Sequence, residues 1–191
     1  MRFAYADPPY PGQAKRLYGQ HPDYAGEVDH AELIGRLVRD YPDGWALSTN
    51  EVSLRAVLLL CPEDVSVAVW HNTNSQPPGA MRTRLWRTWE PVIFHGRTWR
   101  PGDLVVRNLL TASAINRGNR SAEWVDATVP GRKPEVFACW IADLLGAGEG
   151  DQIDDIFPGS GSCGRVFAAR VAQPMLWNLA GTPAAPPQGQ V

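Results

Sequence analysis

The sequence predicts a single α/β domain with a mostly parallel, twisted sheet and helices on both faces. Segments typical of strands alternate along the chain with segments typical of helices, which is the order found when a parallel sheet is covered on both sides. The 191 residues suffice for one such domain but are too few for two of ordinary size. Hydrophobic residues account for 44 % of the chain and charged residues for 20 %, as in folded globular proteins.

In chain order, the first expected strand covers residues 2–6 and ends because Pro8 and Pro9 cannot donate to a strand ladder. A helix is expected from the N-cap Asp29, because apolar residues recur on one helical face up to the break at 42–44. The pattern next predicts a buried strand at 45–48, a helix from about 51 to 60, and strands at 65–70, 91–94 and 104–110.

The best-marked helix begins with Pro134 at its first position and ends before Gly146, which suits the left-handed conformation after a helix. The remaining expected elements are a strand at 152–156, a short helix to about Arg170 and a last strand at 175–179. The domain then spans residues 1–180. Residues 181–191, which contain Pro, Gly and Gln, are expected to form a disordered tail.

The composition argues against membrane, secreted and metal-binding classes. No apolar stretch approaches the roughly 20 residues that cross a bilayer, and the N-terminus has no signal-peptide pattern. The three cysteines lack metal-type spacing, and the four histidines form no HxH or HxxxH pair. We therefore expect a cytoplasmic protein of a bacterial or phage-infected cell, with reduced thiols, no bound metal and no membrane partner.

The charge of the chain is unevenly distributed. The net charge of −2 is not typical of a nucleic-acid-binding protein. However, residues 82–133 hold ten Lys and Arg against four Asp and Glu, whereas the remainder holds eight against sixteen. This distribution predicts one phosphate-facing side, on which the expected nucleic-acid contacts are Arg82, Arg84, Arg117 and Arg120. The alternative is that these arginines pair with the acidic flanks.

Two unusual loops follow predicted strands, one after Ala6 and one after Ile156, and α/β folds bind ligands at the carboxyl ends of strands. The second loop reads Phe157-Pro158-Gly159-Ser160-Gly161-Ser162. Its glycines let the backbone approach a ligand closely, and the helix that follows favours an anion at its N-terminus. The loop lacks the Lys of a P-loop and the third Gly of the dinucleotide fingerprint, so an ordinary strand–helix turn is an equally good interpretation.

The first loop, Asp7-Pro8-Pro9-Tyr10, is more specific. Its prolines hold a carboxylate, a backbone carbonyl and an aromatic ring together. An aromatic amine whose amino group is bound by Asp7 and the Pro8 carbonyl would have its protons engaged. Its lone pair would then point out of the plane of the ring that carries the amine, and Tyr10 would stack on that ring, as on a nucleic-acid base. The alternative is a proline turn that only ends the strand.

These motifs together resemble the S-adenosylmethionine-dependent amino-methyltransferases, in the permuted class in which DPPY comes first and Asp155-Ile156-Phe157-Pro158-Gly159-Ser160-Gly161 follows. Lys133-Pro134-Glu135 is similar to the K-P-x segment of that family. Residues 89–96 are similar to a strand of the branch that includes the catalytic subunit of the messenger-RNA adenosine methyltransferase. The resemblance covers about residues 2–179 and implies a Rossmann-like methyltransferase domain that uses S-adenosylmethionine as its cofactor.

The resemblance also implies residue roles. Asp7, Pro8, Pro9 and Tyr10 would form the catalytic, amine-holding loop. The implied cofactor-binding residues are Lys133 toward the methionine carboxylate, Asp155 near its amino group, Phe157, Gly159, Ser160 and Gly161, with Arg170 and Asn178 toward the ribose. The chain departs from the common pattern because no acid follows Arg170 to bind the ribose.

The implied reaction is methyl transfer to the exocyclic N6 amine of adenine in DNA, with the target base flipped out of the duplex. Asp rather than Ser at position 7 favours adenine. The alternatives are N4 of cytosine, adenosine in RNA, and a non-catalytic methyltransferase-like subunit that binds nucleic acid or a partner.

Overall fold

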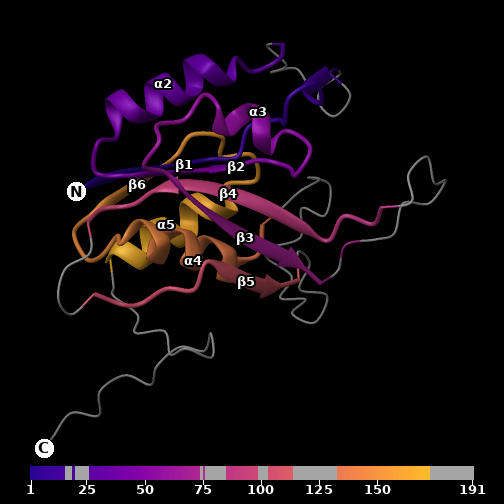
Figure 1. The fold of residues 1–191 in the computed structure, drawn as a ribbon. Coiled ribbons are helices and arrows are strands. Elements are labelled where there is room, and N and C mark those ends of the chain that lie inside the picture. The colour runs from indigo at the N-terminus through magenta and orange to yellow at the C-terminus, as the bar shows by residue number, and fades with distance from the viewer. Residues whose placement is uncertain are drawn as a thin grey trace, which may run out of the picture.

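The structure, a computed structural model, describes residues 1–15, 19, 26–73, 75, 85–98, 103–113 and 133–172. The strands in this part of the chain are β1 (Arg2–Ala6), β2 (Trp45–Ser48), β3 (Ser66–Asn72), β4 (Trp89–His95), β5 (Leu109–Ala112) and β6 (Gln152–Asp155). The longer helices are α2 (His30–Asp40), α3 (Leu54–Leu58), α4 (Glu135–Leu145) and α5 (Ser162–Ala172). The strands form one sheet in the order β5-β3-β4-β2-β1-β6 (Figure 1).

The sheet is mostly parallel, as predicted. β1 pairs parallel with β2 and β6, and β3 pairs parallel with β5, whereas β4 runs antiparallel to both β2 and β3. β4 is therefore the single described strand that runs against the others. Consequently the carboxyl ends of β1, β2, β3 and β6 lie along one edge of the sheet, and β4 begins at that same edge.

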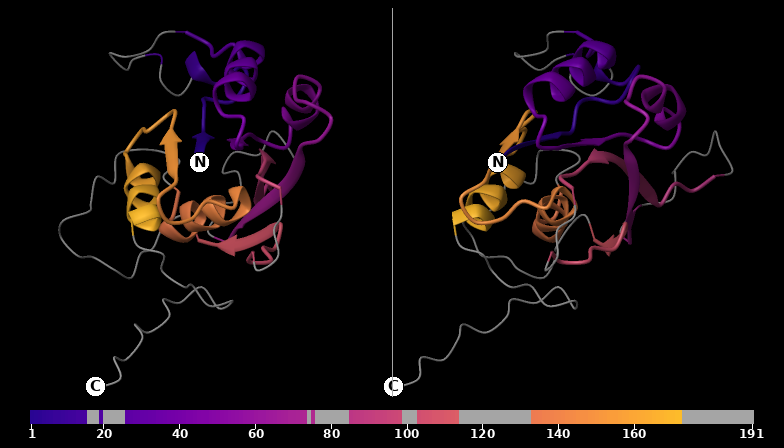
Figure 2. Two further views of the ribbon diagram at one scale, coloured as in Figure 1. Left: turned by 90° about the vertical axis from the view of Figure 1, so that its left-hand side faces the viewer. Right: turned by 60° about the vertical axis from the view of Figure 1, so that its left-hand side comes forward.

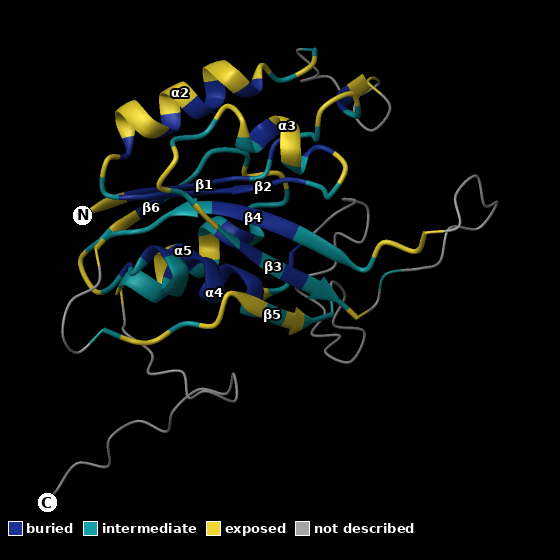
Figure 3. Ribbon diagram, viewed as in Figure 1, coloured by how far each residue is buried: buried dark blue, intermediate teal, exposed yellow. Residues whose placement is uncertain are grey.

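Helices cover both faces of the sheet, also as predicted. α2 and α3 pack on one face, and α4 and α5 pack on the other (Figure 2). α4 is buried on almost all sides, because its sequence is apolar nearly all round, whereas α2 exposes a charged outer face (Figure 3). We refer to the two sides of the sheet as the α4 face and the α2 face.

The predicted helix ends are largely confirmed. The side chain of Asp29 accepts the N–H groups of Ala31 and Glu32 at 2.9 and 3.1 Å, which is an N-cap arrangement. α4 ends at Gly146 in the left-handed conformation, with φ of 71°. α4 starts one residue later than predicted, because Pro134 has an extended backbone and precedes the helix.

Two element predictions were wrong in their bounds. The strand expected at 104–110 is β5, Leu109–Ala112, because pairing with β3 begins only at Val69 and Leu109. The helix expected at 51–60 is α3, which is shorter because the chain first makes a turn in which Asn50 Oδ1 accepts the Ser53 N–H at 2.7 Å. The strand expected at 175–179 and the tail at 181–191 lie outside the described residues.

Candidate active site

Asp7 projects from the carboxyl end of β1 toward the α4 face. In β1, Tyr5 lies in the core of that face, and its hydroxyl is 2.9 Å from Oγ of Ser48 at the end of β2. Since side chains alternate along a strand, Asp7 lies on the same face as Tyr5, just past the last paired residue. The first helix on this side, α4, begins immediately after Lys133.

Asn50 and Glu90 extend this polar group onto the neighbouring strands. In the antiparallel β2–β4 pair Ser48 is opposite Val92, and the Thr49 N–H donates to the Pro91 carbonyl at 3.1 Å. Asn50 comes two residues after the end of β2, and it lines a cavity together with Glu90 of β4. The ends of three neighbouring strands therefore contribute a carboxylate, an amide and a second carboxylate to this region.

Lys133 joins the two carboxylates. Its Nζ is 2.8 Å from Oε2 of Glu90 and 3.3 Å from Oδ2 of Asp7. The lysine is only 6 % exposed, and its ammonium also lies over the rings of Trp70 and Phe137, at 5.3 and 5.7 Å. A buried ammonium is stable only where anions compensate it, so Asp7 and Glu90 are what allow Lys133 to be charged here.

The protonation of this cluster reflects opposing effects. Burial raises the pKa of Asp7, and Glu90 acts in the same direction, whereas the Lys133 ammonium lowers it; the result is a pKa above the ordinary value. Burial alone would lower the pKa of Lys133, but Asp7, Tyr10 and Glu90 outweigh it and raise that pKa well above its usual range. Lys133 is therefore an ammonium at neutral pH.

Tyr10 is fixed at the entrance to this cluster. Its hydroxyl donates to Oε2 of Glu90 at 2.7 Å, so the position of its ring is set by the same carboxylate that binds Lys133. Burial raises the pKa of the Tyr10 hydroxyl well above its usual value, so the group remains a donor.

A cavity of about 400 Å³ opens next to Tyr10 and Glu90, which is within the size range of small-molecule sites. Its lining comes from the ends of several strands and the turns beside them. The lining residues are Tyr10, Gln13, Asn50, Glu51, Val52, Asn72, Ser75, Arg87, Thr88, Trp89 and Glu90. Aromatic rings, amides and carboxylates facing one cavity suit a planar ligand with several hydrogen-bonding groups.

Asp155 lies on the α4 face at the end of β6, opposite Tyr5 of β1. Its Oδ2 accepts the Gly164 N–H of α5 at 3.1 Å. Its Oδ1 is buried and has no hydrogen-bond partner among the described residues. Burial raises the pKa of Asp155, and the Asp7 carboxylate adds to this rise, whereas the backbone N–H groups of Gly164 and Phe157 oppose it. A buried carboxylate oxygen without a donor can accept one from a ligand.

The loop after Asp155 has the backbone conformation that its glycines predict. Gly159 and Gly161 have φ of 48° and 68°, in the left-handed region where glycine is favoured. The Gly161 N–H donates to the Pro158 carbonyl at 2.6 Å, which closes the turn before α5. Phe157 is partly buried against the α2-face core and lines a second cavity of about 210 Å³ with residues of α2. The loop thus reaches across the sheet edge.

The remaining predicted cofactor residues are not brought to this loop. Arg170 donates to Oδ1 of Asp143 in α4 at 3.0 Å. It is eight residues into α5, which is about 12 Å along the helix from its start. Its role toward a ribose stays a prediction, as does the contact of Lys133 with a methionine carboxylate. Asn178 lies outside the described residues.

The predicted nucleic-acid contacts Arg82, Arg84, Arg117 and Arg120 also lie outside the described residues. Three basic residues of the 82–133 segment that the structure describes are paired with acids. Arg87 binds Glu51 at 2.6 Å, and Arg97 forms a two-pronged pair with Asp103. Together with Lys133, this supports the alternative of structural pairing for part of the basic segment.

The sequence motifs do not single out Glu90 or Asn50. Glu90 carries one signal that could have indicated it: it is a charged residue in a segment of otherwise apolar and aromatic character, Trp89 to Phe94, and a charge inside a strand segment is rare without a partner. Asn50 carries no such signal, because Asn after a strand is an ordinary turn residue.

In the described part of the chain, no group of three or more His, Cys, Asp or Glu side chains is arranged to hold a metal ion. The described helices, of which the longest have 11 residues, include none that is long and apolar enough to cross a membrane.

Comparison with solved structures gives a fold-level relationship. The chain is similar to M1.HpyAVI in the crystal structure of its complex with SAM (S-adenosylmethionine), with a TM-score of 0.53 over 88 % of this chain and 77 % of that chain. The chain has a methyltransferase-like fold. The sequence identity is 16 %, so the likeness concerns the fold. No protein-family model matches the sequence, and no curated protein matches it.

Proposed function

We propose that the chain is an S-adenosylmethionine-dependent methyltransferase that methylates the exocyclic amine of a nucleic-acid base, with N6 of adenine in DNA as its target. The observation that carries the proposal is the contact of Lys133 with both Asp7 and Glu90 at the carboxyl end of β1. The Asp7 carboxylate there also raises the pKa of Asp155. The fold shared with a protein crystallised with SAM supports the choice of cofactor.

Asp155 and the glycine loop fit this cofactor. Oδ1 of Asp155 is a buried acceptor that suits the amino group of the methionine part. Gly159 and Gly161 leave room for backbone contact, and Ser160 and Phe157 complete the proposed set. When bound, S-adenosylmethionine supplies a methyl group that its sulfonium already activates.

Asp7 is the group that acts on the amine. Its carboxylate accepts an N–H of the target, orients the lone pair and stabilises the positive charge that develops on the nitrogen. Because burial raises its pKa, Asp7 is also a stronger base than an ordinary carboxylate, and it can take the proton that the methylated amine loses. Lys133 lowers the pKa of Asp7 and so favours its charged form.

The base itself would occupy the cavity beside Tyr10. A ring held by its hydroxyl at Glu90 offers a flat surface for stacking, and base–aromatic stacking is worth about 1–3 kcal/mol. A base in duplex DNA must first be flipped out to reach such a site, which costs a few kcal/mol. The arginines predicted in the 82–133 segment, Arg117 and Arg120 among them, would then bind the backbone.

The experiment is a methyl-transfer assay with labelled S-adenosylmethionine on DNA and RNA, followed by mass analysis of the nucleosides. We expect N6-methyladenine in DNA. Detection of N4-methylcytosine, or of methylated adenosine in RNA, would support the methyl-transfer reaction but identify a different substrate. Cofactor binding in calorimetry without transfer to any of these would favour a non-catalytic subunit. Absence of cofactor binding would overturn the proposal.

A further inference from the structure

The proposed reaction assigns no role to Asn50. This residue lines the 400 Å³ cavity together with Tyr10 and Glu90. The β2–β4 pairing ends at Ser48 and Val92, and the Thr49 N–H bonded to the Pro91 carbonyl extends it to the residue before Asn50. The position of Asn50 is therefore held on one side by the sheet and on the other by the turn that its side chain makes with Ser53.

The orientation of the Asn50 amide is also determined. The Ser53 N–H is 2.7 Å from the side chain, and because an N–H needs an acceptor, the atom that faces it is Oδ1. The carbonyl end of the side chain is thus used inside the turn before α3. What Asn50 can offer to a ligand in the cavity is its NH₂ group, a pair of donors.

Glu90 presents the opposite character next to it. Lys133 and Tyr10 both donate to Oε2 of Glu90, so Oε1 is the oxygen that can accept a hydrogen bond from a further donor. A donor on Asn50 and an acceptor on Glu90 line the same cavity and form a donor–acceptor pair at the ends of adjacent strands. Such a pair is complementary to a ligand edge in which an acceptor stands next to a donor.

We propose that Asn50 donates to the ring nitrogen adjacent to the target amine and thereby selects bases by their Watson–Crick edge. Adenine has the acceptor N1 beside its amino group, and cytosine has the acceptor N3 beside its own. Guanine, thymine and uracil instead carry an N–H at the corresponding ring position and would leave the Asn50 donor facing another donor. Flipped bases are generally read by such contacts to the Watson–Crick edge. This inference rests on the proposed function.

The test compares an oligonucleotide containing adenine with one containing 1-deazaadenine, which keeps the amine and replaces N1 by C–H. The enzyme variant is Asn50→Asp, because its remaining oxygen can still accept the Ser53 N–H while the donors are lost. For the wild-type protein we expect kcat/KM to fall about 10- to 100-fold with 1-deazaadenine. For Asn50→Asp we expect a similar fall with adenine and no further fall with 1-deazaadenine.

Two controls make the comparison specific. Asn72→Asp adds the same charge to the cavity from the end of β3, and we expect it to keep the preference for adenine over 1-deazaadenine. If the fall in kcat/KM with 1-deazaadenine came from an electronic effect of the missing nitrogen, it would occur in wild type and Asn50→Asp alike. If it comes from the loss of a hydrogen bond to Asn50, it occurs only in the wild type. Melting curves establish that each variant is folded.

The outcomes separate this inference from the proposed function. The assignment of Asn50 is wrong if the wild-type protein methylates adenine and Asn50→Asp shows the same fall in kcat/KM with 1-deazaadenine as the wild type. In that case the methyltransferase proposal still stands. If the wild-type protein transfers to no base, the proposed function fails. In that case calorimetry with adenosine and 1-deazaadenosine still tests Asn50, because a preference for adenosine that Asn50→Asp abolishes would support it and equal affinities would overturn it.

Discussion

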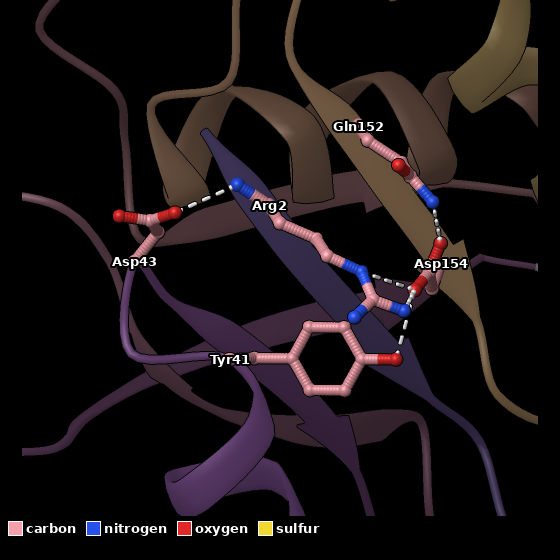
Figure 4. Close-up of polar contacts among 5 residues, drawn as sticks. All are labelled: Arg2, Tyr41, Asp43, Gln152 and Asp154. Carbon is pink, nitrogen blue, oxygen red and sulfur yellow. Dashed lines mark hydrogen bonds and ion pairs between the residues drawn. The ribbon is translucent and has the colours of Figure 1, made fainter.

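Asp154 and Asp155 are neighbours in β6, but their side chains lie on opposite faces of the sheet. Asp155 faces α5 and the candidate active site, where its Oδ2 binds the Gly164 N–H. Asp154 faces α2, where it accepts from Arg2 at 2.6 Å and from the Tyr41 hydroxyl at 2.9 Å (Figure 4). One carboxylate therefore joins the end of α2 to β1 and β6, and the other is available for a ligand.

We predict that Asp154→Asn lowers the stability of the protein without changing methyl transfer, since charge-assisted bonds to Arg2 and Tyr41 are weakened. Chemical denaturation and an activity assay below the melting temperature check this. Asp155→Asn, one residue away, is the matched variant and should instead weaken cofactor binding. If both variants lower activity equally, the division between the two faces is wrong.

Asp154 should also affect acid stability. Burial would raise its pKa, but hydrogen bonds from Gln152, Tyr41 and Arg2 outweigh burial, so the folded-state pKa lies below the ordinary value of 3.8. Because the pKa is lower in the folded state, the carboxylate stabilises the fold above pH 3.8, and this stabilisation is lost as the pH falls through the folded-state pKa. The stability difference between wild type and Asp154→Asn should therefore narrow below about pH 4. A constant difference down to pH 2 would contradict it.

The glycine loop gives the next prediction. Gly161 has φ of 68°, and a Cβ there would be 3.3 Å from the Arg165 guanidinium. The side chain of Arg165 can move, so the main cost of Gly161→Ala is the left-handed backbone, about 1–2 kcal/mol. We expect a loss of cofactor affinity, measured by calorimetry. Gly35→Ala is the control: Gly35 lies inside α2 with open space around it, so this change should stabilise the fold slightly. Normal affinity in Gly161→Ala would remove this turn from the site.

Much of the fold could be predicted because its signals are local. The apolar face of α2, the N-cap Asp29 and the C-terminal Gly146 depend on residues within a few positions of each other. The antiparallel direction of β4 could not be predicted in this way, since it depends on pairing with β2 and β3 across long stretches of chain. The late start of β5 has the same cause.

The candidate site also contains residues that the sequence indicates and residues that only the fold brings to it. Asp7 and the glycine loop are contiguous motifs that follow strands, and the parallel β1–β6 pair brings them to one edge. Glu90 becomes a site residue only through its distant partners Lys133 and Tyr10, and Asn50 only through the cavity that it lines with Glu90. Lys133 was predicted as a cofactor contact, and its ion pairs with Asp7 and Glu90 add a second role that no sequence spacing could indicate.

For Lys133→Met we predict a shift in the pH dependence of methyl transfer. Burial already raises the pKa of Asp7, and the ammonium of Lys133 limits that rise. Removing the ammonium while keeping the buried volume leaves Asp7 beside Glu90 alone, so its pKa should rise further. Since the reaction needs the charged form of Asp7, the acid limb of kcat/KM should move to higher pH. An acid limb that does not move would show that Lys133 does not control Asp7.

The same variant tests the role of Lys133 toward the cofactor. If its ammonium binds the methionine carboxylate, Lys133→Met should weaken S-adenosylmethionine binding by about 1–3 kcal/mol. Calorimetric titration measures this independently of turnover. Unchanged affinity together with a shifted acid limb would assign Lys133 to the carboxylates Asp7 and Glu90 only.

The strongest prediction concerns Asp7 itself. Asp7→Asn keeps the shape of the side chain but removes the charge that supports the amine as it becomes positive, so the rate of methyl transfer should fall on the order of 100-fold or more. Cofactor affinity should remain, because stabilisation that grows in the transition state acts on rate and not on ground-state binding. The stability cost should be modest, since Glu90 still binds Lys133 at 2.8 Å. Asp64→Asn, at an exposed carboxylate near His95, is the control and should leave the rate unchanged. Single-turnover assays with labelled cofactor, run beside melting curves, separate the possibilities. A near wild-type rate would refute the amine-holding role of Asp7, and an unfolded variant would mean that the carboxylate is chiefly a structural partner of the buried lysine.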